Sequence, residues 1–154
     1  YVRNGCPSKG TVDIFIEPSL PLPELVVIGG SPVAKALCSL GAQFQFAIRV
    51  IDPDVGLLSS PRQRFVVIAT QGQGDMLALN AALSCDPSSI SFVGSSRKFA
   101  ALSQKLLDAG ADPAAVRSVK APAGLNINAV TPDEIALSIL AELVKQRRAA
   151  RAEV

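Results

Sequence analysis

The fold of this chain is decided by the stretch Val26-Val27-Ile28-Gly29-Gly30-Ser31-Pro32-Val33-Ala34-Lys35-Ala36-Leu37. An aliphatic run, a glycine turn and a second apolar run after a proline predict a buried strand, a tight turn and the start of a helix. The turn lies where a dinucleotide-binding domain carries G-x-G-x-x-G, but only Gly29 falls on that pattern. Ser31 and Ala34 occupy the two other glycine positions. The turn alone leaves open whether it still binds phosphate.

The same alternation of strand and helix continues along the chain. Nearly continuous aliphatic runs lie at residues 25–28, 47–51, 65–69 and 90–93. Helical patterns lie at residues 32–40, 75–84 and 96–109, and a short run at 116–119 predicts one more strand. Runs of this kind are typical of strands buried on both faces. The pattern therefore predicts a three-layer α/β domain with a mainly parallel sheet and helices on both faces.

The two ends of the chain differ from this central pattern. Residues 11–17 alternate between apolar and polar, which predicts a half-buried strand, and a proline-rich segment follows at 18–23. We expect residues 1–23 to be a strand and connector from a truncated or absent upstream domain. The α/β domain is then expected at residues 24–148, followed by a basic tail at 149–154.

The last helix carries the clearest start signal in the sequence. Thr131-Pro132-Asp133-Glu134 combines an N-cap threonine, a proline at the first helical position and a capping-box glutamate. Near its far end lie Arg147, Arg148 and Arg151, where positive charge suits the helix dipole. We interpret these arginines as a solvated helix end rather than a nucleic-acid patch.

Composition limits the kinds of protein this chain can be. It has 154 residues, of which 49% are hydrophobic and 18% charged, as in a globular domain with one core. The net charge of +2 is too small to predict nucleic-acid binding. No apolar run approaches the roughly 20 residues of a membrane helix. The three cysteines form no C-x-x-C pair, which fits a reducing cytoplasm.

Catalytic residue patterns are missing from the sequence. The chain contains no histidine, which excludes Ser-His-Asp and Cys-His catalysis. Its carboxylates are scattered, without a pair spaced for acid–base work, and no G-x-x-x-x-G-K-[ST] sequence is present. We therefore expect a binding protein rather than an enzyme, with no metal site.

Loops that follow the predicted strands carry the candidate binding residues, because ligands of such sheets bind at the carboxyl ends of the strands. In the first loop we select Gly29, Gly30, Ser31 and Lys35, whose backbone and side chains could hold a phosphate. In the second we select Asp52, at the distance from Gly29 where an acidic residue binds a ribose hydroxyl. A turn or cap is an equally ordinary role for this aspartate.

The third and fourth loops add amide, hydroxyl and cationic groups. In the third we select Thr70 and Gln71, able to hydrogen-bond a heterocycle edge, and expect Asp75 to cap the next helix. The fourth contains Gly94, Ser95, Ser96, Arg97 and Lys98. Cations in the first turn of a helix oppose its dipole, and a bound anion would relieve that mismatch. The fourth loop is therefore the main candidate for a phosphate or pyrophosphate site.

Three stretches of the sequence resemble the XdhC/CoxI family and its C-terminal Rossmann-like domain. Residues 121–142, APAGLNINAVTPDEIALSILAE, are similar to the family's A-P-x-G-L-x-I-x-A-x-T-P-x-E-I-A-x-S-I-L-A-E. Residues 94–98 look like its G-S-x-R-K segment after a strand, and residues 6–18 look like the stretch that joins its two domains. In departure from the family, Pro32 stands where members often have a histidine, and Asn126 and Asn128 replace Asp and Gly.

The resemblance implies a maturation factor for molybdenum hydroxylases of the xanthine dehydrogenase or carbon monoxide dehydrogenase type. Such a chaperone binds the molybdenum cofactor, as molybdopterin or its cytosine dinucleotide, during sulfuration and insertion. The implied partners are the apo-hydroxylase and a cysteine desulfurase, and a homodimer is a further candidate. Two other functions stay open from the residues: an NAD(P)-binding oxidoreductase domain, and a scaffold that only docks the apo-hydroxylase.

Overall fold

The computed structural model of the protein describes residue 15 and residues 21–152. The strand predicted at 11–17 lies, except for Phe15, outside the described residues. Along the chain the elements are β1 (Glu24–Ile28), α1 (Pro32–Gly41), the 3₁₀ turn η1 (Ala42–Phe44), β2 (Ala47–Ile51), β3 (Arg64–Ile68), α2 (Asp75–Ser84), β4 (Ser89–Phe92), α3 (Ser96–Asp108), α4 (Pro113–Ser118) and α5 (Pro132–Ala152). Within this part of the chain, four parallel strands form one sheet in the order β2-β1-β3-β4.

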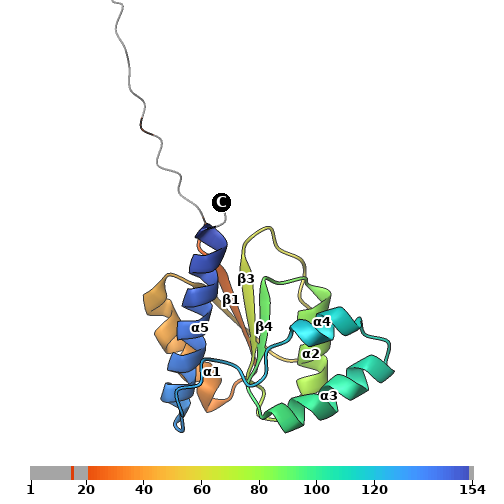
Figure 1. Ribbon diagram of the computed structural model, residues 1–154. Coiled ribbons are helices and arrows are strands. Elements are labelled where there is room, and N and C mark those ends of the chain that lie inside the picture. Colours follow the sequence, from red (N-terminus) through yellow and green to blue (C-terminus); the bar gives the residue numbers. More distant parts are fainter. Residues whose placement is uncertain (1–14, 16–20, 153–154) are drawn as a thin grey trace, which may run out of the picture.

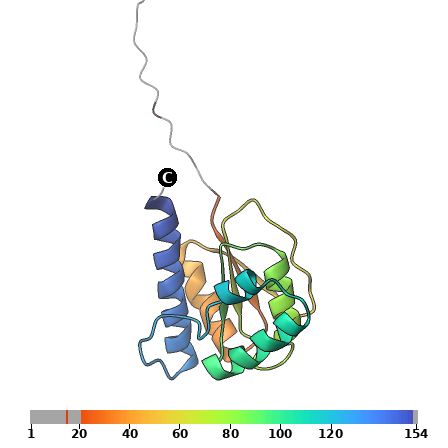
Figure 2. The same ribbon diagram turned by 45° about the vertical axis from the view of Figure 1, so that its right-hand side comes forward.

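The sheet lies between two helical layers, as the sequence predicts. Figure 1 shows α1 and α5 on one side and α2, α3 and α4 on the other, and Figure 2 shows the same layers after rotation. Alternate residues of β1 and β3 supply two separate cores, with Leu25 and Val27 facing α1 and α5, and Val26 and Ile28 facing α2. The central strands β1 and β3 are almost wholly apolar because both of their faces are buried, whereas Arg49 and Val50 of the edge strand β2 are exposed.

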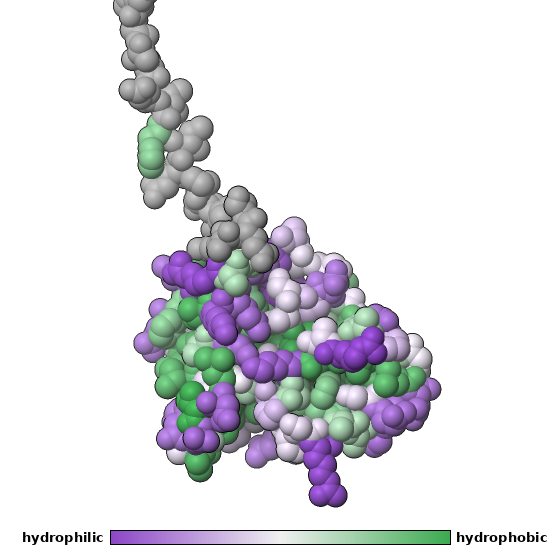
Figure 3. Space-filling view, viewed as in Figure 1, coloured by the Kyte–Doolittle hydropathy of each residue, from purple (hydrophilic) through white to green (hydrophobic). Residues whose placement is uncertain are grey.

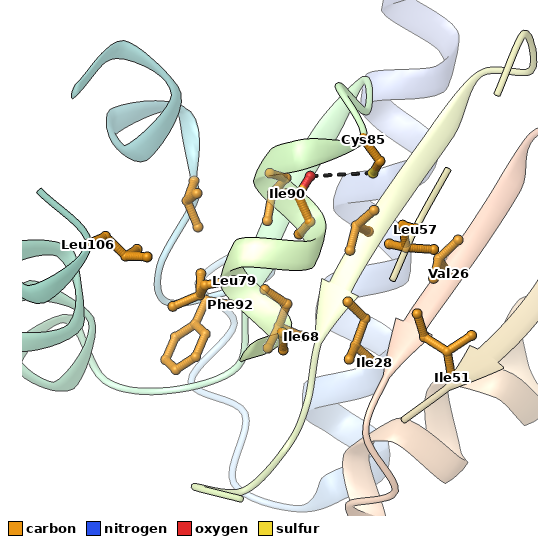
Figure 4. Packing of buried hydrophobic residues seen from close by; sticks show 14 of the residues in the cluster. Val26, Ile28, Ile51, Leu57, Ile68, Leu79, Cys85, Ile90, Phe92 and Leu106 are labelled. Carbon is orange, nitrogen blue, oxygen red and sulfur yellow. Dashed lines mark hydrogen bonds between the residues drawn. The ribbon is translucent and has the colours of Figure 1, made fainter. Parts of the chain in front are cut away.

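No helix connects β2 to β3; the loop at residues 52–63 covers the sheet there. Its Leu57 is buried against Val26 and Ile51, as Figure 4 shows. At the other end of the sheet the buried guanidinium of Arg64 donates to Glu24 Oε2 at 2.6 Å and to the Leu58 carbonyl oxygen. Two anchors, one apolar and one ionic, therefore hold this long loop on the sheet.

The strand predicted at residues 116–119 is wrong, because helix α4 occupies most of it. Asp112 and Pro113 start this helix: the Asp112 carboxylate accepts from the N–H groups of Ala114 and Ala115. The chain extends only afterwards, where Lys120 makes an isolated parallel bridge with Ser91 of β4. The two apolar residues of this stretch, Val116 and Val119, are buried, but they belong to a helix and the segment that leaves it.

Helix α5 begins as predicted and ends differently. Thr131 Oγ1 accepts from the N–H of Glu134, and Glu134 Oε2 accepts from the N–H of Thr131, which confirms the capping box. The solvated arginine end is wrong for Arg147, whose buried guanidinium donates to the Phe44 carbonyl at 2.7 Å and lies 4.6 Å from the Phe46 ring centroid. Because the helix continues to Ala152, Arg147 lies within its packed face; Arg148 is exposed.

Candidate functional site

The carboxyl ends of β1, β2 and β3 lie level, since Ile28 is paired with both Ile51 and Ile68, and Ile68 with Phe92 of β4. From β1 the chain passes to β2 on one side, and then returns to β3 on the other. The crevice between β1 and β3 is therefore the switch point at which open α/β sheets bind ligands. The loops after all of the strands start at this edge, which lies at the bottom of Figure 1.

The first loop places Gly29 directly against the end of β3. Gly29 has φ +106°, and a Cβ atom there would lie 2.7 Å from the Ala69 oxygen and 2.8 Å from the Thr70 Cα. The next residue, Gly30, is exposed, and an added Cβ would meet no atom within 4 Å. The inner side of this turn is closed by protein and its outer side is open, as a phosphate-binding turn requires.

Ser31 and Lys35 take different roles at the start of α1. The Ser31 hydroxyl accepts from the N–H of Ala34 at 3.1 Å and is buried, so it serves as the N-cap. Lys35, one turn into the helix, is exposed at the same edge. Of the two polar side chains selected here, the lysine is the one free to reach a ligand.

Asp75 does not cap α2, contrary to expectation. Gly74 is the N-cap, and Asp75 is the first helical residue with its carboxylate buried. One carboxylate oxygen accepts from Thr70 Oγ1, and the other lies 2.6 Å from Lys98 Nζ. Lys98 Nζ also lies 5.5 Å from the centroid of the Phe92 ring. Lys98 therefore joins the third loop to the fourth.

The charge of Asp75 depends on these partners. Burial alone would raise the pKa of Asp75, but the bonds from Lys98 and Thr70 outweigh it and hold the pKa below its ordinary value. Such a carboxyl stabilises the fold above its unfolded pKa, near 4, and this contribution is lost as the pH falls through the folded pKa. Lys98 and Thr70 are thus structural supports of the edge.

Lys98→Met is expected to destabilise the protein by about 1–2 kcal/mol at pH 7 because it leaves a buried carboxylate without its ion pair. The cost is less than for a fully buried pair, since the Lys98 side chain is 39% exposed. Without the lysine the Asp75 pKa rises, so the variant should lose less stability than the wild type on acidification below pH 4. Urea unfolding between pH 3 and 7, with the exposed Lys105→Met as control, measures this; equal pH slopes would contradict it.

The fourth loop presents backbone donors and one exposed cation. Ser95 is the N-cap of α3, its hydroxyl accepting from the N–H of Lys98 at 3.2 Å. The N–H groups of Ser96 and Arg97 have no partners within the helix, because they belong to its first turn. Both side chains are exposed. Gly94, just before the cap, packs so closely that a Cβ would lie 2.5 Å from Cε1 of Phe92.

Asp52 and Gln71 also lie at this edge. Asp52 is exposed at the end of β2, and the next residue, Pro53, reaches the start of α2, where a Cβ on Gly74 would lie 2.7 Å from the Pro53 Cβ. Gln71 is exposed in the third loop with φ +54°. All four predicted loops are thus at one edge of the sheet, although Ser31, Thr70, Ser95 and Lys98 mainly support it.

A cavity of about 690 Å³ at the same edge was not predicted from the sequence. It is lined by Val93 and Gly94 after β4, by Lys120 and residues 122–129, and by Ile135 and Ser138 of α5. Within the cavity loop, residues 122–129 are distinctive in the sequence only through their resemblance to a family. The mixture of apolar and asparagine residues at 125–128 is the signal that could have indicated a binding loop.

The buried carboxylate of Glu142 holds one end of the cavity loop. Its Oε2 accepts from the N–H of Gly124 at 3.0 Å, and its Oε1 accepts from Lys120 Nζ. Lys120 Nζ also donates to the Gly124 carbonyl oxygen at 3.0 Å. Burial, and then the charge of Lys145, lower the pKa of Lys120. The ammonium group of Lys120 is thus bound both to Glu142 of α5 and to the backbone of the cavity loop.

A parallel sheet with a glycine turn at its switch point and helix N-termini along that edge defines a Rossmann-like α/β domain. The chain belongs to the XdhC family: it matches that family's XdhC Rossmann domain over residues 25–143. This match confirms the resemblance and the fold class inferred from the sequence. Among the described residues, no helix is both long and apolar enough to cross a membrane.

Two further proteins and one solved structure are similar to this chain. The chain is 29% identical to YqeB of Escherichia coli K12, over 93% of its own length and 32% of YqeB. It is 27% identical to a Bacillus subtilis 168 protein named as a probable xanthine dehydrogenase subunit, over 90% of this chain and 47% of that one. A crystal structure described as a xanthine dehydrogenase from Bacillus halodurans matches with TM-score 0.72 and 25% identity, over 86% of this chain and 46% of that chain. The chain thus spans less than half the length of each of these relatives.

Proposed function

We propose that this domain belongs to a maturation factor that holds the molybdenum cofactor for a hydroxylase of the xanthine dehydrogenase or carbon monoxide dehydrogenase type. Family membership and the names of two relatives support a role connected with xanthine dehydrogenase. The observation that carries the binding proposal is that the Gly29 and Thr70 loops meet at the switch point, with the Gly94 loop beside them at the same edge. The proposed partners are the apo-hydroxylase and a cysteine desulfurase.

The groups at this edge fit a phosphate-bearing cofactor. The first turn of α3 offers the N–H groups of Ser96 and Arg97, with the Arg97 guanidinium beside them. Across the edge, Gly30 leaves open space and Lys35 is an exposed second cation. These residues would hold the phosphate or pyrophosphate, while the Lys98–Asp75 pair keeps the third and fourth loops in place.

In the proposed function this chain only holds the cofactor and shields it from solvent. The bound cofactor would supply the molybdenum centre, and the proposed cysteine desulfurase would supply the sulfur that is installed on it. The chain contributes backbone donors, cations and the surrounding loops, and Asp75, the buried carboxylate at the edge, is already committed to Lys98 and Thr70. We therefore assign the domain a binding role and no catalytic residue.

One observation keeps dinucleotide binding as a second candidate function. Asp52 is exposed at the end of β2, beside β1, where an acidic residue of dinucleotide-binding domains meets a ribose hydroxyl. An NAD(P) ligand would use the same phosphate groups on α3. The two candidates differ in the ligand bound, so one titration separates them.

Calorimetric titration with molybdopterin, its cytosine dinucleotide and NADPH is expected to show binding of the molybdenum cofactor forms. Arg97→Glu should weaken that binding tenfold or more, because it replaces a charge-assisted hydrogen bond with repulsion. The melting temperature should not fall, since Arg97 is exposed. The matched control is Arg148→Glu, which changes an exposed arginine near the far end of α5. Binding of NADPH alone would favour the second candidate, and cofactor affinity unchanged by Arg97→Glu would remove this arginine from the site.

A further inference from the structure

The cavity beneath residues 122–129 lies beside the proposed phosphate site, not within it. Its walls are largely apolar: Val93 follows β4, Ile135 belongs to α5, and Leu125 and Ile127 belong to the loop at residues 122–129. The volume of about 690 Å³ is within the range of small-molecule sites. Apolar side chains gather on the surface over the lower part of α5 and the loop before it, as Figure 3 shows. The cavity thus opens in an apolar region at the ligand edge of the sheet.

Polar groups in this cavity are neutral or already neutralised. The only charged lining side chain among the described residues is Lys120, and its ammonium group is paired with Glu142. Asn126 and Asn128 line the cavity and are exposed, and Asn126 Oδ1 accepts from the N–H of Asn128 at 3.3 Å. A carboxamide both donates and accepts hydrogen bonds. The lining therefore suits an uncharged, flat group with a mixed donor and acceptor edge, and disfavours a phosphate.

Gly94 connects the cavity to the anion-binding end of α3. It lines the cavity, and the cap and first turn of α3 follow it directly at Ser95 and Ser96. A ligand with a ring in the cavity can therefore place a phosphate on the N–H groups of the α3 first turn. The close packing of Gly94 on Phe92 fixes the backbone that separates the two parts.

We infer that this cavity binds the uncharged heterocyclic ring of a ring-bearing phosphate whose phosphate lies on the N-terminus of α3. The inference rests on the proposed function and deepens it by assigning the ring end of the cofactor to residues 122–129. A pterin and a pyrimidine share the required chemistry. The experiment uses both rings as separate probes.

The test is calorimetry on the whole chain with three probes: cytidine 5′-diphosphate, 6-hydroxymethylpterin diphosphate and inorganic pyrophosphate. At least one ring diphosphate is expected to bind ten times more tightly than pyrophosphate. Ala129→Phe, which fills the cavity, should abolish that advantage and change pyrophosphate affinity less than twofold. Ala149→Phe on the exposed far end of α5 is the matched control and should change neither.

A second variant keeps the inference testable if Ala129→Phe unfolds. Asn128 has φ +57°, a conformation open to glycine, so Asn128→Gly removes the carboxamide without straining the backbone. It should lower ring diphosphate affinity about three- to tenfold and leave pyrophosphate binding unchanged. Three results would overturn the inference. The ring diphosphates could bind no better than pyrophosphate, their higher affinity could survive both substitutions, or no probe could bind at all.

The outcome separates this inference from the proposed function. Molybdopterin binding that depends on Arg97 but is unaffected by Ala129→Phe would overturn the ring site and leave the proposed function standing. A ring advantage that Ala129→Phe abolishes, in a chain that does not bind molybdopterin, would support the ring site and overturn the proposed function.

Discussion

Gly29→Ala is expected to lower the free energy of unfolding by about 2–5 kcal/mol. Two costs add at this position. The backbone has φ +106°, where an L-residue with a side chain is strained. The new Cβ would also lie 2.7 Å from the Ala69 oxygen and 2.8 Å from the Thr70 Cα, which are backbone atoms at the end of β3. The ends of β1 and β3 would have to separate, opening the switch point.

Gly30→Ala is the matched control for this prediction. It makes the same chemical change one residue later, but its Cβ would meet no atom within 4 Å. We expect a change within about 0.5 kcal/mol, as for an unconstrained surface substitution. Urea unfolding followed by circular dichroism compares the two variants. Equal stability of both alanine variants would show that Gly29 is not required by the packing of β1 against β3.

Much of the fold follows from local patterns. The central strands β1 and β3 are buried on both faces, so their aliphatic runs are recognisable without knowledge of their neighbours. Helices α1 and α5 begin at Ser31-Pro32 and Thr131-Pro132, where a capping side chain precedes a proline. Both start signals consist of neighbouring residues, so they can be recognised from the sequence alone. The strand prediction at 116–119 is wrong because Val116 and Val119 are the only apolar residues of this short stretch, too few to distinguish a strand from a buried helical turn.

The two adjacent cations of the fourth loop show why the roles of the site residues were harder to predict than the fold. Arg97 and Lys98 look alike in the sequence, yet helix geometry turns neighbouring side chains in different directions. Lys98 pairs with Asp75, 23 positions earlier, whereas Arg97 is exposed. The same limit applies to Arg147, whose acceptor is the carbonyl of Phe44 on a distant turn. Local sequence gives the charge of a side chain, but its role depends on tertiary partners.

The cavity depends on still longer-range packing. Its loop is held by Glu142, one residue of a long helix whose side chain gives no sign of burial in the sequence. Its opposite wall is the β4–α3 turn, some thirty positions earlier in the chain. A resemblance could mark residues 121–142 as distinctive, but only the contacts of the folded chain show that they enclose a space beside the phosphate site.

Gly124→Ala is expected to cost about 3–5 kcal/mol and to abolish the ring-dependent part of ligand binding. Gly124 has φ +91°, and a Cβ there would lie 2.3 Å from Ser138 Oγ and 2.9 Å from the Ile139 nitrogen in α5. The loop would be pushed from the helix, and the bond from the Gly124 N–H to Glu142 would break. The cavity lies between this loop and α5, so its shape is lost with the contact.

Gly110→Ala is the control that separates backbone strain from the steric clash with α5 as causes of the lost stability. Gly110 has nearly the same backbone angle, φ +89°, but an added Cβ would meet no atom within 4 Å. It should therefore cost only the backbone strain, about 1 kcal/mol, and leave the ring advantage in calorimetry unchanged. Adding Ser138→Ala to Gly124→Ala removes the nearest clashing atom and should restore part of the stability in a double-mutant cycle. If Gly124→Ala costs no more than Gly110→Ala and keeps the ring advantage, contact between residue 124 and α5 does not shape the cavity.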